Sequence, residues 1–287
     1  MQEIKCGNSS VKINETGAEL KSFRAQDKEI VWQTIPAVWN SSAPVLFPFV
    51  GLVRNNRFSF DGKEYQIGKH GFVRNKEFSI DEKHESSVKF LYSYSEETLK
   101  SYPFKFEFFV NFSLVSEKRL IVEYEVKNVD SKNMFFSLGS HPALDLPMKG
   151  TCHEDYYIEF EQPETVFLYK LVDGLLERQK TAFMTDEKIV KLGKHVFDDD
   201  ALIFTGIKSR YCYLKNDKTK SCVSVCFDGA PDLGIWAKPG ADYVCIEPWF
   251  GYNDPADFNG SLEQKPGIIS LKAEKSFTAF YAIELIS

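Results

Sequence analysis

Hydrophobic and polar residues alternate with a period of two along most of this chain of 287 residues. Residues 10–14 and 18–23 alternate on either side of Gly17, and residues 87–94 do so again. Alternation puts the hydrophobic side chains on one face of an extended segment, so it predicts half-buried β-strands. Further strands are expected at residues 29–32, 58–67, 104–114, 119–126, 134–138, 156–160, 165–170, 211–214, 222–227, 243–246 and 277–285.

The turn signals favour an antiparallel arrangement of these strands. Asp61-Gly62 lies between alternating hydrophobic positions, which is the strongest short hairpin signal in the chain. Helical signals are few: residues 96–101 are expected to form one turn, and residues 255–262 a short helix or loop. No linker-like composition and no repeat divides the chain. The pattern therefore predicts an all-β protein, one large antiparallel sandwich forming a single domain over residues 1–287.

Composition and charge narrow the classes of function. The chain carries 35 Lys and Arg against 41 Asp and Glu, a net charge of −6, which argues against a nucleic-acid partner. No run of eighteen apolar residues predicts a membrane span, and the N-terminal residues do not resemble a secretory signal, so a cytoplasmic location is expected. The 25 Phe, 13 Tyr and 4 Trp suit a pleated core and stacking against sugar faces.

The six cysteines show no paired CxxC spacing. Cys222 and Cys226 lie four residues apart on one face of a predicted strand, with no histidine nearby in the sequence. The spacing therefore argues against a zinc site at this pair, and free buried thiols in a reducing compartment are expected.

The segment from Tyr243 to Gly251 is the first candidate for chemistry. A predicted buried strand ends at Glu247, and Pro248 and Trp249 follow. A carboxylate beside apolar and aromatic neighbours is typical of a general base with a raised pKa. The alternative is a carboxylate that turns out to solvent at the end of the strand.

Two of the five histidines stand at predicted strand ends. His70 precedes Gly71, whose missing side chain lets backbone or ligand approach closely, and His141 follows a strand that breaks at Gly139. Each alone is more consistent with a structural imidazole than with a catalyst. Imidazoles titrate near neutral pH, however, and together with a carboxylate the two form a candidate acid–base set. His84 and His195 are expected at the surface, and His153 is expected to be structural.

Three arginines lie close to these histidines in the sequence. Arg54 and Arg57 follow an apolar segment, and Arg74 comes four residues after His70. Guanidinium groups bind vicinal hydroxyls, carboxylates or phosphate. A surface role is the simpler interpretation for Arg54.

These motifs carry a family resemblance. Asn56-Arg-Phe, Asp61-Gly and His70-Gly-Phe resemble, in order, motifs of the aldose 1-epimerases, also called galactose mutarotases. Residues 139–143, Gly-Ser-His-Pro-Ala, are similar to the second-histidine motif of that family, and residues 245–249, Cys-Ile-Glu-Pro-Trp, resemble its LacX-like branch. The resemblance covers nearly the whole chain. Around Glu247 and His141 the sequence differs from the better-known galactose mutarotases, and these differences bear on which sugar is preferred more than on the reaction.

The resemblance implies a β-supersandwich of the galactose mutarotase type with a sugar in a cleft. It assigns the base role to Glu247 and the acid role to His141, and the sugar-holding roles to the following residues: Arg57, His70, Arg74, a stacking Trp236 and an acidic residue, Asp200 or one of its neighbours Asp198 and Asp199. The implied partner is a free or phosphorylated hexose. The oligomeric state stays open, a homodimer included.

Anomer interconversion asks for these residue types. A base removes the proton of the C1 hydroxyl while an acid protonates the ring oxygen; the ring opens, the C1–C2 bond rotates and the ring closes on the other face. The chemistry needs no metal or other cofactor, and it starts from an ionised Glu247 and a protonated His141. Two alternatives remain: a sugar-binding or regulatory protein without turnover, and a glycan lyase or hydrolase, which would need a second catalytic carboxylate.

Overall fold

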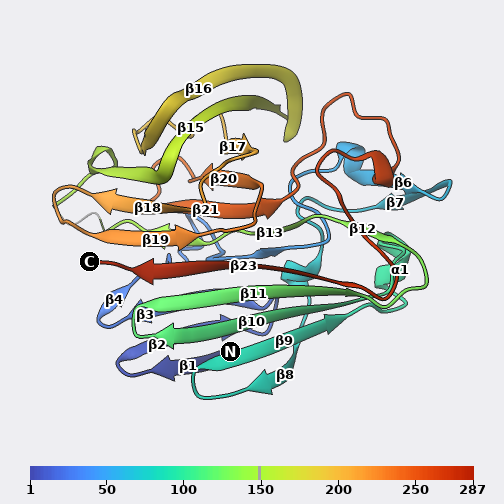
Figure 1. The fold of residues 1–287 in the computed structure, drawn as a ribbon, viewed down its shortest axis with the longest axis horizontal. Helices are drawn as coiled ribbons and strands as arrows, with labels where there is room; N and C mark the ends of the chain where they lie inside the picture. The colour runs from blue at the N-terminus through green and yellow to red at the C-terminus, as the bar shows by residue number, and fades with distance from the viewer. Residues whose placement is uncertain (148–149) are drawn as a thin grey trace.

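The fold is described from a computed structural model that covers residues 1–147 and 150–287, and it consists almost entirely of antiparallel strands (Figure 1). The largest sheet has nine strands in the order β16-β15-β18-β19-β23-β11-β10-β9-β8. Its strands are β8 (Ser79–Lys83), β9 (Ser87–Ser93), β10 (Phe106–Ser116), β11 (Arg119–Asn128), β15 (Tyr156–Val172), β16 (Leu175–Lys191), β18 (Tyr211–Asn216), β19 (Cys222–Cys226) and β23 (Ser276–Leu285).

A second layer lies behind this sheet in the view of Figure 1 and contains the sheet that carries the candidate site. That sheet has the order β17-β20-β21-β13-β5, with β14 also paired to β21: β5 (Val45–Leu46), β13 (Leu138–Ser140), β14 (Ala143–Asp145), β17 (Leu202–Thr205), β20 (Asp232–Trp236) and β21 (Tyr243–Phe250). A four-stranded sheet contains β1 (Gln2–Cys6), β2 (Ser9–Asn14), β3 (Glu19–Ala25) and β4 (Lys28–Glu29). One two-stranded sheet pairs β6 (Arg57–Phe60) with β7 (Lys63–Gln66), and another pairs β12 (Met134–Phe136) with β22 (Ile269–Leu271). The helical elements are α1 (Thr98–Ser101), η1 (Arg54–Asn56), η2 (Val73–Asn75), η3 (His153–Asp155) and η4 (Leu262–Gln264).

The hairpins expected from the alternating pattern are present. Strands β2 and β3 pair around the turn that contains Gly17, and β10 pairs with β11 over nearly their whole lengths. Asp61 and Gly62 connect β6 to β7, with φ angles of 49° and 69°. Both angles lie in the left-handed region that a two-residue hairpin turn requires, which explains why this dipeptide marks the turn.

The long hairpin β15–β16 differs from the expectation of two short strands at residues 156–160 and 165–170. A single strand of 17 residues runs through both segments, and the pattern did not predict its partner β16 at all. Most residues of β16 are exposed, and they include many charged side chains. Because neither face is consistently buried, the strand carries no period-two signal.

Strand β21 also differs from the expectation, because it does not end at Glu247. It continues through Pro248 to Phe250, and seven of its eight residues are buried. Glu247 therefore lies in the middle of a buried strand rather than at a solvent-facing end. The segment 255–262, expected to form a short helix or loop, is a loop up to the helical turn η4, which begins at Leu262.

The core between the layers is rich in phenylalanine. Phe106, Phe108 and Phe112 point inward from β10 and are almost completely buried. The ring of Phe47 stacks on Phe108 with centroids 4.6 Å apart. Alternation of large rings along one strand therefore fills the space between the sheets and fixes the face that β10 buries.

A buried ion pair holds the segment that follows β21. Lys265 Nζ lies 2.7 Å from Asp254 Oδ1, both side chains are 2% exposed, and Nζ also donates to the carbonyl oxygen of Tyr252 at 2.7 Å. The other carboxylate oxygen of Asp254 accepts the backbone N–H of Arg54. Burial lowers the pKa of Lys265, and the charge of Asp254 opposes that shift.

Replacing Lys265 by methionine is expected to lower the free energy of unfolding by about 3–5 kcal/mol, because the charge of Asp254 stays buried without its partner. Urea unfolding measures the change. The matched control is Arg178→Met, which removes the exposed ion pair between Arg178 and Asp257 and should change stability by less than about 1 kcal/mol. Equal effects of the two substitutions would contradict the structural role of the buried pair.

The six cysteines are free thiols, as expected, although only Cys212 and Cys245 are buried and Cys152 is exposed. No helix within residues 1–147 and 150–287 has the length and apolar character needed to cross a membrane.

Candidate active site

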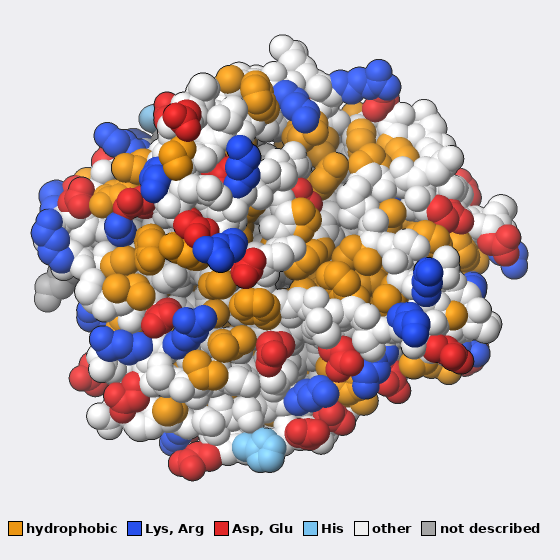
Figure 2. Space-filling model, in the orientation of Figure 1, with side chains coloured by type: hydrophobic (Ala, Val, Ile, Leu, Met, Phe, Trp, Pro, Cys, Tyr) orange, Lys and Arg blue, Asp and Glu red, His pale blue; other side chains and the backbone are white. Residues whose placement is uncertain are grey.

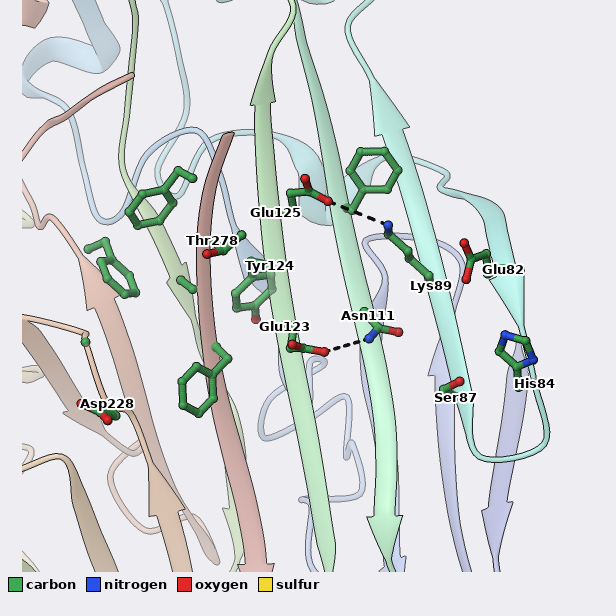
Figure 3. A pocket seen from close by; sticks show the side chains of 16 residues that line it. Glu82, His84, Ser87, Lys89, Asn111, Glu123, Tyr124, Glu125, Asp228 and Thr278 are labelled. Atoms are coloured by element: carbon green, nitrogen blue, oxygen red, sulfur yellow. Dashed lines mark hydrogen bonds and ion pairs between the residues drawn. The ribbon is translucent and has the colours of Figure 1, made fainter. Parts of the chain in front are cut away.

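Two hollows are candidates for the functional site. The larger, about 820 Å³, lies on the outer face of the nine-stranded sheet, where hydrophobic side chains gather between charged ones (Figure 2). Two pairs of its polar side chains interact: Lys89 lies 3.8 Å from Glu125, and Asn111 donates to Glu123 at 2.9 Å (Figure 3). Apart from Arg57, the acid–base and sugar-binding residues predicted from the sequence lie elsewhere, around the second hollow.

The smaller hollow, with a cavity volume of about 200 Å³, lies over the face of β21 that carries Glu247. It collects six of the seven site residues predicted from the sequence and several residues that were not predicted. The lining residues are Trp39, Ser41, Pro44, Lys69, His70, Arg74, His141, Leu171, Asp200, Ala201, Ile203, Trp236, Glu247, Trp249 and Asn253.

Strand register brings His141 opposite Glu247. Gly139 pairs with Trp249 on one side of the gap between β13 and β14, and Ala143 pairs with Cys245 on the other. Counting inward from both pairs aligns position 141 with position 247, where the side chains of neighbouring strands stand side by side. His141 Nε2 lies 3.3 Å from Glu247 Oε2.

Burial controls the protonation of this pair. Glu247 is 1% exposed, and burial raises the pKa of its carboxyl well above the usual value, while the charge of Lys69 acts in the opposite direction. Burial lowers the pKa of His141 to about 3. These shifts favour a protonated Glu247 beside a neutral His141. The raised pKa of Glu247 agrees with the expectation, whereas burial disfavours the ionised Glu247 and the protonated His141 that the reaction is expected to start from.

Backbone contacts fix His70 and its ring orientation. Its N–H donates to the carbonyl oxygen of Gly51 at 2.8 Å, and its Nδ1 accepts the N–H of Gly51 at 3.1 Å. A neutral ring that accepts at Nδ1 carries its proton on Nε2, so His70 presents a donor. Gly71 is required beside it, because a Cβ there would lie 2.2 Å from the carbonyl oxygen of Phe47.

Aromatic rings wall the cavity around His141. Trp39 and Trp236 lie with their ring centroids 5.1 and 5.7 Å from that of the imidazole. A Cβ on Gly234 would lie 2.6 Å from the ring of Trp249, so the missing side chain makes room for that ring. Flat apolar walls around a polar floor suit a sugar, whose two faces are apolar and whose edges carry hydroxyls.

Charged residues stand at the rim of the cavity. Lys69 and Arg74 are exposed and come from the segment that carries His70. No carboxylate of residues 1–147 or 150–287 lies within ion-pair distance of either cation. Of the three consecutive aspartates, Asp200 lines the cavity, whereas Asp198 contacts His195.

Arg57 is the predicted site residue that the structure does not bring to this cavity. It begins β6, lines a separate hollow next to Arg54, and its Nη1 lies 3.3 Å from Glu64. Arg57 and His70 are only thirteen positions apart, yet they line different hollows. The family resemblance of the Asn56-Arg57 motif assigned Arg57 to the sugar, and a motif alone does not place the side chain in the cavity.

Trp39, Lys69 and Asn253 are among the lining residues that the sequence analysis did not assign to the site. Lys69 has a weak signal, since it directly precedes His70. Trp39 lies in an irregular turn and forms a β-bridge with Ile35, so the sequence there shows no alternating pattern of hydrophobic residues. Asn253 is buried, and its Nδ2 donates to the carbonyl oxygen of Gly174 at the tip of the hairpin β15–β16, a contact that only the tertiary structure creates.

Comparison with known proteins shows the family and the fold. The family model described as aldose 1-epimerase matches residues 1–282. The plasmid-encoded protein LacX of Lactococcus lactis subsp. lactis is 31% identical over 297 residues, covering 99% of each chain. A galactose mutarotase related enzyme from Lactobacillus acidophilus is 37% identical with a TM-score of 0.94, over 100% of this chain and 97% of that one. A galactose mutarotase-like protein from Lactobacillus casei ATCC 334 is 27% identical with a TM-score of 0.90, over 99% of both chains. The all-β supersandwich expected from the resemblance is confirmed.

Proposed function

The chain belongs to the aldose 1-epimerase family, and on that premise we propose that it interconverts the α and β anomers of a hexose or hexose phosphate. The observation that carries the proposal is the contact of 3.3 Å between His141 Nε2 and Glu247 Oε2 on the floor of a cavity walled by tryptophan. An acid and a base side by side, both shielded from water, are what opening and closing a sugar ring requires.

The pair neither gains nor loses a proton over the cycle. In the first half-reaction Glu247 takes the proton of the C1 hydroxyl, and His141 gives one to the ring oxygen. The pair then consists of a protonated carboxyl and a neutral imidazole, which is the arrangement that burial favours. Ring closure on the other face reverses both transfers, so the pair returns to its starting state without exchanging a proton with solvent.

The other cavity residues would position the sugar. His70 presents its Nε2–H, Trp236 offers an apolar face, and Asp200 can accept hydrogen bonds from the sugar hydroxyls. The cavity draws its residues from segments that span Trp39 to Asn253, which supports one catalytic domain over residues 1–287.

The test is the rate at which a freshly dissolved pure anomer of glucose or galactose reaches equilibrium, followed by polarimetry or exchange NMR. The proposal predicts a rate that rises linearly with enzyme concentration and far exceeds that of buffer. A rate equal to that of buffer, with sugar binding retained, would identify a sugar-binding protein instead, which the tryptophan walls alone would also support.

The two rim cations favour a phosphorylated sugar. Arg74 presents a planar fork that matches phosphate oxygens, and Lys69 adds a second positive charge on the same segment. Since mutarotation needs a free C1 hydroxyl, the phosphate must be attached elsewhere, and C6 is the position that leaves the ring intact. Binding a dianion would also offset the positive charges that oppose protonation of His141.

Glucose 6-phosphate is therefore expected to show a kcat/KM at least about tenfold above that of glucose, because each charge-assisted hydrogen bond contributes about 1.5–3 kcal/mol. The variants Lys69→Gln and Arg74→Gln should remove this preference while the value for glucose stays within about twofold. Lys63→Gln and Arg24→Gln make the same changes at exposed positions outside the cavity and serve as controls. Equal kcat/KM values for the two sugars would leave the enzyme a mutarotase of unphosphorylated hexoses.

A further inference from the structure

A buried thiol lies directly beside the acid–base pair. Cys245 is on β21 two residues before Glu247, so both side chains point to the same face of the sheet. It pairs with Ala143 of β14 and with Trp236 of β20, and it is completely buried. One ligand atom each from His141, Cys245 and Glu247 all lie within 4.8 Å of one another.

The acid–base pair has capacity for a further ligand. Glu247 Oε2 is buried, and within residues 1–147 and 150–287 it accepts no hydrogen bond of normal geometry, although His141 Nε2 lies 3.3 Å from it. Buried polar atoms without partners are rare because each costs free energy, so such atoms point to something that binds them. Substrate hydroxyls satisfy them during turnover, but a sugar gives no reason for a thiol at this place.

We propose that His141, Cys245 and Glu247 form a binding site for a thiophilic divalent cation, Zn²⁺ in particular, which excludes the sugar when it is bound. Imidazole nitrogen, thiolate sulfur and carboxylate oxygen are the three ligand types that Zn²⁺ takes in proteins. A thiolate and a carboxylate also balance the charge of the ion, so the occupied site is neutral in its buried surroundings.

The geometry needs only a small contraction. Zn²⁺ binds sulfur at about 2.3 Å and nitrogen or oxygen at about 2.0–2.2 Å, which places tetrahedral ligand atoms roughly 3.3–3.7 Å apart. The nitrogen–oxygen distance of 3.3 Å between His141 and Glu247 already has this value. The thiol needs to approach by at most about 1 Å, which rotation about side-chain bonds provides. Because His141 and Glu247 line the cavity, a water molecule in the cavity can supply the fourth ligand.

The donor set also predicts which ions fail to bind. Mg²⁺ and Ca²⁺ prefer six or more oxygen ligands and gain little from a thiolate or an imidazole. Zn²⁺, Cd²⁺ and Co²⁺ should bind, and all three should release when a chelator is added. Inhibition of mutarotation by these ions depends on the proposed function, but their binding does not.

Binding is tested on the full chain with Co²⁺ and Zn²⁺ alone. Co²⁺ should produce the near-ultraviolet charge-transfer absorption of a cobalt–thiolate bond, and Zn²⁺ added afterwards should abolish it at one equivalent. Zn²⁺ affinity is measured by calorimetry in wild type, Cys245→Ser and Cys152→Ser. Cys152 is the matched control because it is an exposed thiol next to His153 and Asp155, the obvious competing surface site.

The proposal expects Cys245→Ser to lose the cobalt–thiolate absorption and at least about tenfold in Zn²⁺ affinity, with Cys152→Ser unchanged. If Cys245→Ser does not fold, the proposal is tested on the wild-type protein. Galactose or glucose 6-phosphate at saturation should displace Co²⁺ from the wild-type site. Loss of the absorption in Cys152→Ser, absence of it in wild type, or no displacement by either sugar would overturn the site. Mutarotation that is absent while the absorption is present would reject the proposed function and leave the metal site standing.

Discussion

Replacing Glu247 by glutamine is expected to lower kcat for mutarotation by about 10²–10⁴-fold, because the amide cannot take the proton of the C1 hydroxyl. Glutamine has nearly the shape of the carboxyl and needs no charge in the buried site, so the fold should be retained. Polarimetry under saturating sugar measures kcat, and thermal unfolding checks the fold. A variant with full activity would remove Glu247 from the reaction.

The matched control for this substitution is Asp232→Asn. Asp232 is a second buried carboxyl, on β20 next to β21, and burial raises its pKa to about 6. It accepts the N–H of Gly251 and does not line the cavity. Its amide variant should keep kcat within about threefold, so a comparable loss in both variants would indicate a general effect of removing buried carboxyls.

Replacing His141 by asparagine is the second large effect: kcat is expected to fall by about 10²–10³-fold, because no group then protonates the ring oxygen as it leaves C1. The asparagine amide can still donate a hydrogen bond to that oxygen, which is why we expect a smaller loss than for Glu247. The same initial-rate measurement applies, with His153→Asn as the control at a half-exposed imidazole outside the cavity.

His70→Asn separates acid catalysis from positioning. His70 holds its ring through Gly51 and presents a donor to the cavity, so its loss should act mainly on KM. If His70→Asn and His141→Asn lower kcat equally, the assignment of the acid to His141 fails, while the family and its reaction class remain.

Much of the fold was predictable because its hairpins are local. Asp61 and Gly62 supply the positive φ angles of their turn whatever surrounds them, and the phenylalanines of β10 alternate because one face of that strand is buried. Strand β16 escaped prediction for the opposite reason, since its two faces are similarly exposed. The strand end assigned to Glu247 was wrong because Pro248 is a poor strand former by itself, yet it is accommodated where β13 and β14 leave a gap beside β21.

The candidate site, like the fold, was predictable from the sequence only in part. The chemical types of Glu247, His141 and His70 and the order of their motifs were recognisable from the sequence, because a motif is a local string of residues. The position of Arg57 was misjudged, and Trp39 and Asn253 were missed, because each depends on where a hairpin or an irregular segment folds back.

The sequence by itself determined an antiparallel β protein with a carboxylate and two histidines of the right kind for acid–base chemistry. Only the tertiary structure decided that position 141 faces position 247, that Lys69, Arg74 and Asp200 share the rim, and that Cys245 lies beside the pair. The physical reason is that alternation and turn residues act over a few positions along the chain. Register and burial, in contrast, arise between strands about a hundred residues apart, and these two properties set both the 3.3 Å contact and the pKa values of the pair.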